Sequence, residues 1–497
     1  MIALLALRSL LSRPWRSLFL LFGYGLGVGV MIVLLAIGEA LLTQARDERL
    51  VGGGEITVLP SGLDIEVMKT GGVGGLYFSI DNARFVYRQL LAAPRLAGSV
   101  SAAAPQITGK LLYLRTPTAE YAVRAAGEVP SRSEAVGAGP SLADGAWRDD
   151  DGDRRWIAPT PYELYSEIDH FHFPPPGLDH PASWGEWHYF NVLSADHKRW
   201  AFVSFIVGGD VRAGDWGAQV AITLRSEGGR TRRFATTVPD DSVRFSTQTP
   251  DLVLGESRVT LLPDASYRVR ARARSEQGGS DVVTVDLVVT PAPDAFFPGA
   301  TLASGRFTSG YAVPALRASA TGRVCVAGSC ERYDSAQSYH DHNWGVWRGG
   351  RWEWGATRAG SYTLLYGRVE PPDTTMARAP LFMYLVDSLG FRALFRPREI
   401  QYVDGRNILV DGRDVRVPSS AVLVDARGQD TIRVELTIED AIGTDTRGSL
   451  IERGEAGVAR MLRTPYFIQM KGRARVSGRV GGAPIQGEGH GFFETYR

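Results

Sequence analysis

An excess of charge of either sign is lacking in this chain. Its 497 residues carry 55 Lys and Arg and 54 Asp and Glu, which gives a formal net charge of +1 at pH 7. A protein that holds nucleic acid through phosphate contacts needs a basic surface, so we expect no nucleic-acid partner. With 44% hydrophobic residues, the chain is also too apolar for a disordered polar protein.

Signature motifs of several enzyme classes are lacking as well. The sequence contains no Gly-x-Ser-x-Gly elbow, no phosphate-binding glycine-rich loop and no His-Glu-x-x-His pair. Their absence argues against an α/β-hydrolase, a nucleotide-dependent enzyme and a zinc protease of the common types. We expect no cofactor.

Cysteine is scarce, with only Cys325 and Cys330 present. The residues between them, Val-Ala-Gly-Ser, are typical of a hairpin loop between two short strands, which would place the two thiols opposite each other at disulfide distance. We predict a disulfide, given an oxidising compartment. The alternative is a reduced pair, and a zinc site is weakly indicated because no further Cys or nearby His accompanies the two thiols.

Long hydrophobic runs are limited to one. No charged residue occurs from Ser17 to Ile37, which matches the roughly 20 residues that a bilayer core needs. Arg8, Arg13 and Arg16 precede this run, so the positive-inside rule predicts a cytoplasmic N-terminus and a periplasmic or extracellular body. A cleaved signal peptide is the alternative, but the run is longer than usual and lacks an Ala-x-Ala site. We expect a single-pass anchor in the cytoplasmic membrane.

Changes in composition divide the remainder of the chain. Residues 131–156 combine small and acidic residues without apolar periodicity, which is typical of a linker. Segments with period-two alternation follow, such as 200–207, 218–224 and 282–289, and predict strands. About 340 residues of such structure are more than one small barrel uses, so we expect a mainly β chain with two barrels. The predicted segments are 1–42 (cytoplasmic N-terminus and anchor), 43–140 (a small α/β segment), 141–157 (linker), 158–334 (first barrel) and 335–497 (second barrel).

Polar residues that could carry chemistry gather in two places. One is Asp169-His-Phe-His-Phe173, followed by Glu186-Trp-His-Tyr-Phe-Asn191; the other is Tyr339-His-Asp-His-Asn-Trp-Gly345, followed by Trp352-Glu-Trp354. If residues 339–343 form a strand, its alternation puts an acid and a phenol on one face and two imidazoles on the other. A carboxyl in an apolar, Trp-lined cavity would have a raised pKa and could protonate a weakly basic substrate such as an alkene.

Structural roles compete with catalysis for these residues. Buried Asp, His and Tyr often satisfy one another, and clustered Trp side chains often fill a core or line a pocket. A metal would find two ligands in His170 with His172, or in His340 with His342, but a third would have to come from elsewhere. We expect no metal site.

The motif Tyr339-His-Asp-His-Asn-Trp-Gly345, together with Glu186 to Asn191, Trp352-Glu-Trp354 and the closing Gly-Glu-Gly-His-Gly-Phe-Phe-Glu, resembles the AttH/CrtC-like group, which includes the carotenoid 1,2-hydratases (hydroxyneurosporene synthases). The resemblance covers about 160–497 and implies two tandem lipocalin-like (calycin) barrels with an apolar ligand cavity. For the hydratases it implies protonation of an isolated C=C bond and addition of water without an organic cofactor. On this match the catalytic residues would be Tyr339, Asp341 as proton donor, and His342. The expected ligand contacts are Glu186, Trp187, His188, Tyr189, Asn343, Trp344, Trp352, Glu353 and Trp354.

The chain departs from that group in two ways. His188 stands where the group has the second Trp of Glu-Trp-Trp-Tyr. The hydratases also place a His and a Trp shortly before the Tyr-x-Asp element, whereas here no His occurs between His197 and His340 and no Trp between Trp216 and Trp344. These departures bear on the reaction more than on the fold.

The N-terminal segment resembles a different family. The glycine-rich apolar run with its preceding Ala-Leu-Arg-Ser-Leu-Leu-Ser-Arg-Pro-Trp is similar to the first membrane helix of MacB/FtsX-type ABC transporter permeases, and residues 52–60 resemble the start of their periplasmic domain. Those permeases have further membrane helices, whereas this sequence has no second apolar run that is long enough to cross a membrane.

Three functions therefore remain open. The first is a membrane-anchored extracytoplasmic protein that binds or delivers an apolar ligand, an isoprenoid or lipid, in association with ABC transporter subunits. The alternative is an enzyme of carotenoid 1,2-hydratase type. A scaffold that only binds another protein is the third, and it predicts a closed interior with an exposed apolar patch.

Overall fold

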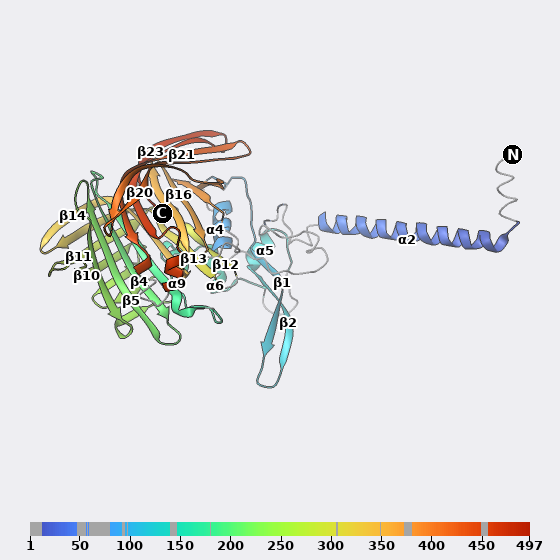
Figure 1. Cartoon of the computed structure of the whole chain (residues 1–497). Helices are drawn as coiled ribbons and strands as arrows, with labels where there is room; N and C mark the ends of the chain where they lie inside the picture. The colour runs from blue at the N-terminus through green and yellow to red at the C-terminus, as the bar shows by residue number, and fades with distance from the viewer. Residues whose placement is uncertain are drawn as a thin grey trace. The chain divides into compact units, whose positions relative to one another are not determined.

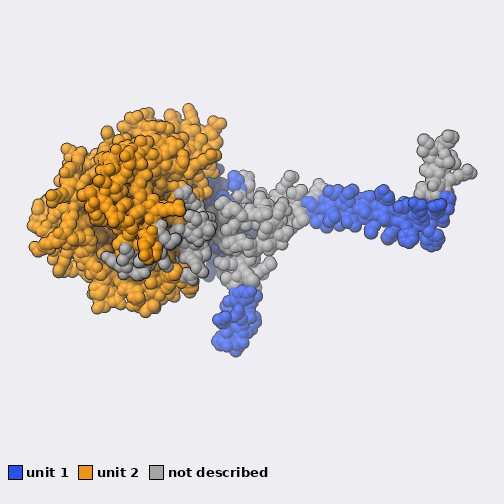
Figure 2. Space-filling view, viewed as in Figure 1, with its two compact units in different colours: residues 1–92, 96–154 blue, residues 93–95, 155–497 orange. Residues whose placement is uncertain are grey.

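The computed structural model describes residues 12–46, 56, 58, 80–91, 95–96, 98–139, 147–178, 180–304, 307–347, 349–371, 380–448 and 456–497. The chain divides into two compact units, Met1–Ala92 with Leu96–Arg154, and Ala93–Arg95 with Arg155–Arg497 (Figure 2). Almost all of the permease-like stretch 52–60 lies outside the described residues.

The first unit contains the apolar helix. α2 (Pro14–Arg46) includes the 25-residue stretch Pro14–Gly38, which has a mean hydropathy of 2.5 and is not buried. Large side chains such as Phe22 and Leu35 stand exposed along it. The helix is therefore long and apolar enough to cross a membrane, as predicted for residues 17–37, although a signal sequence near an N-terminus would have the same properties.

Helices and strands follow one another in the rest of this unit. α4 (Ile80–Leu91) precedes an antiparallel hairpin of β1 (Gln106–Arg115) and β2 (Glu120–Glu128), and α5 (Pro130–Ala135) comes next. α6 (Asp151–Ile157) then carries the chain into the second unit. The predicted linker 141–157 is thus helical from Asp151 onward, and its residues 141–146 lie outside the described residues.

An eight-stranded antiparallel barrel makes up the first part of the second unit (Figure 1). Its strands follow the order β11-β13-β14-β3-β4-β5-β6-β10, and β10 pairs back to β11 from Tyr267↔Val289 to Arg274↔Val282, which closes the barrel. The short strands β9, β8 and β7 extend from β10, and β12 pairs with β13. The bounds are β3 (Trp184–Leu193), β4 (Arg199–Asp210), β5 (Asp215–Ser226), β6 (Arg232–Pro239), β7 (Val243–Phe245), β8 (Leu252–Leu254), β9 (Ser257–Leu261), β10 (Tyr267–Ser275), β11 (Val282–Pro291), β12 (Phe297–Ser304), β13 (Phe307–Val326) and β14 (Ser329–Val346).

A second antiparallel sheet of nine strands follows, in the order β18-β17-β16-β15-β23-β22-β21-β20-β19. It curls around one hydrophobic core to which both ends and the middle of the sheet contribute, through residues such as Phe395, Val410 and Phe493. The bounds are β15 (Arg351–Ala359), β16 (Tyr362–Glu370), β17 (Phe382–Asp387), β18 (Gly390–Phe395), β19 (Gln401–Val410), β20 (Arg413–Arg427), β21 (Asp430–Asp445), β22 (Tyr466–Val480) and β23 (Ala483–Tyr496), with α9 (Ala456–Met461) between β21 and β22. The chain is thus mainly β, consistent with the predicted tandem lipocalin-like barrels.

The division between the two sheets lies later than predicted. β14 pairs with β13 from Ser329 to Gly345 and with β3 from Gln337 to Val346, so the expected boundary between residues 334 and 335 falls inside a strand. The first sheet ends at Val346 and the second begins at Arg351. The Tyr339 to Gly345 motif therefore belongs to the first barrel.

A two-residue turn joins β13 to β14. Ala327 and Gly328 have φ values of 48° and 87°, and positive φ at both central positions is the signature of a type I′ hairpin turn. Cys325 lies opposite Cys330 in the register, and the two form a disulfide. The predicted hairpin is present, but its strands are long, with 20 and 18 residues.

Within the second unit, the two sheets contact each other through apolar and charged groups. Arg225 of β5 forms a two-point ion pair with Asp440 of β21, at 2.9 and 3.0 Å. An apolar cluster lies across the same contact and consists of Leu193, Trp200, Phe202, Ile442 and Phe492.

Candidate active site on the two faces of β14

Strands β3 and β14 carry most of the predicted site residues. Their pairing runs without interruption from Leu193↔Gln337 to Trp184↔Val346, so His342 lies opposite His188. Because successive side chains of a strand point to opposite faces, the motif separates into two groups, as predicted. His340 and His342 lie on one face, and Tyr339, Asp341 and Asn343 lie on the other.

His340 and His342 contact the carboxylate of Asp169, a residue that lies outside the barrel strands. α7 (Pro161–Ile168) begins with a capping box between Thr160 and Glu163, and it ends at Asp169. The chain then enters the barrel end, where the Phe171 amide donates to the Ser246 carbonyl at 3.0 Å. Asp169 is fully buried there. We call Asp169, His172, Glu186, His188, His340 and His342 the histidine cluster.

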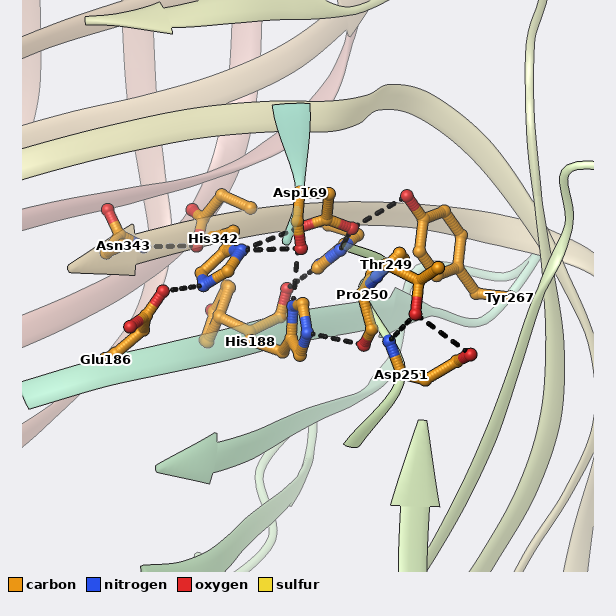
Figure 3. A network of polar contacts seen from close by, with 12 residues as sticks. Asp169, Glu186, His188, Thr249, Pro250, Asp251, Tyr267, His342 and Asn343 are labelled. Carbon is orange, nitrogen blue, oxygen red and sulfur yellow. Dashed lines mark hydrogen bonds and ion pairs between the residues drawn. The ribbon is translucent and has the colours of Figure 1, made fainter. Parts of the chain in front are cut away.

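Asp169 is the centre of this cluster (Figure 3). The Tyr267 hydroxyl donates to its Oδ2 at 2.7 Å, and His340 Nε2 lies 3.0 Å from the same oxygen. His342 Nδ1 lies 2.9 Å from Oδ1, and His188 Nδ1 lies 3.5 Å from Oδ1. Three imidazoles and one phenol therefore surround one buried carboxylate.

Glu186 is the second carboxylate of the cluster. His342 Nε2 lies 2.9 Å from Glu186 Oε1, so the His342 ring connects the two acids. His172 contributes its Nδ1 at 2.8 Å and its backbone N–H at 2.9 and 3.0 Å. Trp344 stacks on the His172 ring with a centroid distance of 4.1 Å.

Charges within the cluster shift its pKa values in opposite directions. Burial alone would raise the pKa of Asp169, but His340 and His188 outweigh it and hold that pKa well below its usual range. Burial would lower the pKa of His342, yet its bonds to Asp169 and Glu186 raise it to about 9. Burial lowers the pKa of His188 well below its usual value. The cluster thus contains imidazoles in different protonation states.

The opposite face of β14 carries the acid cluster, which we define as Tyr339, Asp341, Asn343, Trp354 and Glu494. The Tyr339 hydroxyl and the Asn343 amide donate to the two oxygens of Asp341, each at 2.7 Å. Trp354 Nε1 of the second sheet donates to the Tyr339 oxygen at 2.8 Å. Asp341 and Tyr339 are buried, at 4% and 5% exposure. A carboxyl is therefore held between neutral donors at the contact of the two sheets.

Burial dominates the titration of the acid cluster. It raises the pKa of Asp341 to about 7, against the opposing hydrogen bonds of Tyr339 and Asn343. Burial likewise raises the pKa of Glu494 to about 7, and the Asp341 charge adds to this effect. Trp352 Nε1 donates to Glu494 at 2.8 Å, and Gln469 Nε2 donates at 3.3 Å. The two carboxyls interact electrostatically, and both have pKa values close to neutral pH.

Partly exposed tryptophans lie beside this cluster. Trp187 packs against Trp347 and Trp352, with ring centroids 5.0 and 6.3 Å away. Because Trp352 also donates to Glu494, the aromatic group connects the half-buried surface with a partly buried acid.

The structure distributes the predicted site residues over both faces. Glu186, His188, His342 and Trp344 lie in or against the histidine cluster, whereas Tyr339, Asp341, Asn343, Trp354, Trp352, Trp187 and Tyr189 lie on the side of the acid cluster. Glu353 belongs to neither group. It alternates with Trp352 and Trp354 along β15, so it points to the other face of the second sheet and pairs with Arg368.

Two acids of these clusters were not among the predicted site residues. Asp169 precedes the His-Phe-His run that marked the first polar group, and Glu494 ends the closing Gly-Glu-Gly-His-Gly-Phe-Phe-Glu. Both acids lie in sequence motifs that suggested a functional site. Local spacing does not show, however, that residues 171 positions apart, such as Asp169 and His340, come into contact.

No family model and no curated protein matches the chain. Several solved structures are similar at low identity. A crystal structure described as a putative AttH from Nitrosomonas europaea is 15% identical with a TM-score of 0.43, over 65% of this chain and 98% of that chain. CghA with Sch210972 is 15% identical with a TM-score of 0.41, over 66% and 97% of the two chains. Kievitone hydratase from Nectria haematococca is 13% identical with a TM-score of 0.39, over 66% and 96%. TM-scores this low leave the function to be argued from the chain's own residues, and the permease resemblance of the N-terminal segment gains no support.

Proposed function

We propose that this chain is an acid–base enzyme that adds water to an isolated C=C bond of an apolar substrate, with Asp341 as the proton donor. The observation that carries the proposal is the position of the Asp341 carboxyl, which is buried and held between the Tyr339 hydroxyl and the Asn343 amide at 2.7 Å each. A carboxyl moved from water to such a site is favoured in its protonated form, and an alkene needs an acid that still holds its proton near neutral pH.

A second acid supplies the partner that hydration requires. Asp341 would transfer its proton to one alkene carbon, and water would bond to the other, cationic carbon. That water must lose a proton, which the Glu494 carboxylate can accept. The sum is alkene plus water to alcohol, and returning the proton from Glu494 to Asp341 restores the starting state. One acid protonated and one ionised is the usual arrangement of two coupled carboxyls.

Aromatic side chains support an apolar substrate. Trp187, Trp347 and Trp352 form a partly exposed group beside Glu494, and Trp354 donates its N–H to Tyr339. Flat apolar rings of this kind suit an isoprenoid or similar unsaturated chain. Delivery of an intact apolar ligand, the other function expected from the sequence, would need an open apolar interior, and the second sheet is filled by its own side chains around Tyr366 and Phe493.

We also propose that α2 anchors the enzyme with its body outside the cytoplasm. Three arginines precede the apolar run, and the Cys325–Cys330 disulfide requires an oxidising compartment. An anchor would hold the active site near a bilayer that supplies apolar substrate. Association with ABC transporter subunits rests on the N-terminal resemblance alone.

The test is turnover by the full chain in detergent. Acyclic isoprenoids with isolated double bonds are incubated with the enzyme, and products one water heavier are sought by mass spectrometry. We expect Asp341→Asn to lower turnover by at least about 100-fold, while Asp286→Asn, which changes a partly exposed surface ion pair with Arg268, leaves it unchanged. Equal turnover by Asp341→Asn and wild type would remove Asp341 from the mechanism.

A further inference from the structure

We propose that Asp169, His188 and His340 form a binding site for one divalent transition metal ion, for which Zn²⁺ is the best match to two imidazoles and one carboxylate. The site lies in the histidine cluster, on the face of β14 that the proposed hydration does not use. The sequence predicted histidine pairs at 170/172 and 340/342 without a third ligand, and only His340 of these belongs to the proposed site. The fold adds Asp169, which follows α7, and His188 of β3.

The three side chains are fully buried and close enough to share one ion. A carboxylate oxygen of Asp169, His188 Nδ1 and His340 Nε2 all lie within 4.8 Å of one another. His188 Nδ1 lies 3.5 Å from Asp169 Oδ1, and His340 Nε2 lies 3.0 Å from Asp169 Oδ2. Zinc bonds of about 2.0–2.1 Å place neighbouring donors of a tetrahedral ion about 3.3–3.4 Å apart, which is close to both of these separations.

Backbone carbonyls fix which ring nitrogens are free to bind a metal. His188 Nε2 lies 3.0 Å from the Pro250 carbonyl, and His340 Nδ1 lies 3.1 Å from the Tyr189 carbonyl. A carbonyl oxygen only accepts, so each of these nitrogens carries the hydrogen. In the neutral rings the lone pairs are then on His188 Nδ1 and His340 Nε2, the two nitrogens aimed at Asp169. Metal-binding histidines are typically oriented by this kind of outer hydrogen bond.

His188 Nδ1 is an unsatisfied ring nitrogen of the histidine cluster. It is buried and has no hydrogen-bond partner among the described residues, although it faces an Asp169 oxygen. A metal ion between the His188 Nδ1 lone pair and the Asp169 carboxylate would give both atoms a partner.

Two side chains that are not proposed ligands also hold the Asp169 carboxylate in place. The Tyr267 hydroxyl donates to Asp169 Oδ2 at 2.7 Å, and His342 Nδ1 donates to Oδ1 at 2.9 Å (Figure 3). Such partners keep a metal-binding carboxylate in place. The neighbouring group of His172, Glu186 and His342 also brings three ligand atoms together. There, however, His172 is partly exposed and gives both its ring and its backbone N–H to Glu186.

The test uses the full chain, purified in detergent without a histidine tag. Metal content is measured by plasma mass spectrometry, and after chelation the apo-protein is titrated with Zn²⁺ or with Co²⁺ as a spectroscopic probe. We expect about one ion per chain, a higher melting temperature with Zn²⁺, and a visible Co²⁺ spectrum of a tetrahedral site. An apo-protein that binds neither ion, with no change in melting temperature, overturns the proposal.

Matched variants locate the ion. His188→Gln and Asp169→Asn should weaken Zn²⁺ binding more than about tenfold, whereas His172→Gln in the neighbouring group and the distant His490→Gln should retain it. Loss of binding in His172→Gln with retention in His188→Gln would overturn the assignment. If His188→Gln does not fold, as judged by circular dichroism, the wild-type titration with Co²⁺ still decides whether a tetrahedral site exists.

Discussion

On one face of β14, Asp169 and Glu186 are buried among histidines, whereas on the other face Asp341 is buried among neutral donors. Both environments remove a carboxylate from water, but their electrostatic outcomes differ. Nearby imidazoles keep the pKa of Asp169 low, while burial raises the pKa of Asp341 to about 7. The difference shows that burial alone does not decide the charge of an acid; the charge of its hydrogen-bond donors does.

The largest expected effect is on the histidine side. Asp169→Ala leaves the His342 ring buried next to an empty anion position, and breaking a buried ion pair from one side costs about 3–5 kcal/mol of unfolding free energy. Urea unfolding of the full chain measures the loss. Asp286→Ala, at a partly exposed pair with Arg268, should cost less than about 1 kcal/mol. Equal losses in both variants would contradict the contrast between the two faces.

A pH effect of similar size is expected on the acid side. The unfolded chain ionises Glu494 near pH 4.5, but the folded chain retains the proton up to about pH 7. Stability therefore falls as pH rises through this window, and ionisation above it costs about 3 kcal/mol. Glu494→Gln should abolish that loss, so that the variant gains on wild type between pH 4.5 and 8 in urea unfolding. Parallel stability curves for the two proteins would rule out a raised pKa at this position.

Removing the disulfide tests whether the hairpin end of β14 affects only the stability of the fold and not turnover at Asp341. Cys325 and Cys330 close a short loop at the hairpin turn, well before Tyr339 in sequence. Replacing both by Ser should cost about 2 kcal/mol, the chain-entropy value for a loop this short. Turnover by the folded variant should be unchanged. A melting curve measures the loss of stability. A fall in turnover well below the melting temperature would mean that the hairpin end affects the acid cluster.

The smallest effect sharpens the acid side further. Trp354→Phe keeps an aromatic ring but removes the N–H that donates to Tyr339 at 2.8 Å. We expect a loss of about 1 kcal/mol, the net value of one hydrogen bond, together with a measurable fall in turnover. Trp216→Phe, which changes a ring in contact with Phe245, is the control. A variant indistinguishable from wild type in both measurements would exclude a role for the Trp354 N–H in the acid cluster.

How much the sequence could predict follows from how local each signal is. Alternation over 339–343 predicted both faces of β14, because the period of a strand is a local property. Asp169 and Glu494 were not predicted because their partners lie elsewhere in the sequence and only the folded sheets bring them together. Glu353 was grouped with its two Trp neighbours by proximity in sequence, although the same alternation sends it to the opposite face.

The predicted boundary at 334/335 failed for a related reason. It placed a hairpin of short strands before the motif, whereas β14 continues for 18 residues from the disulfide end to Val346. Ser335 has a φ of 51°, but the pairing with β13 resumes beyond it. An irregular position inside a long strand therefore does not end the domain here.

The uninterrupted pairing of β14 with β3 restricts how related sequences can differ in length. Insertion or deletion of a single residue between Gln337 and Tyr339 would exchange the two faces, turning Asp341 toward the imidazoles and His342 toward the tryptophans. Two residues would restore the parity. Among relatives that preserve both clusters, length changes in this part of the strand should therefore come in even numbers or be absorbed as a bulge.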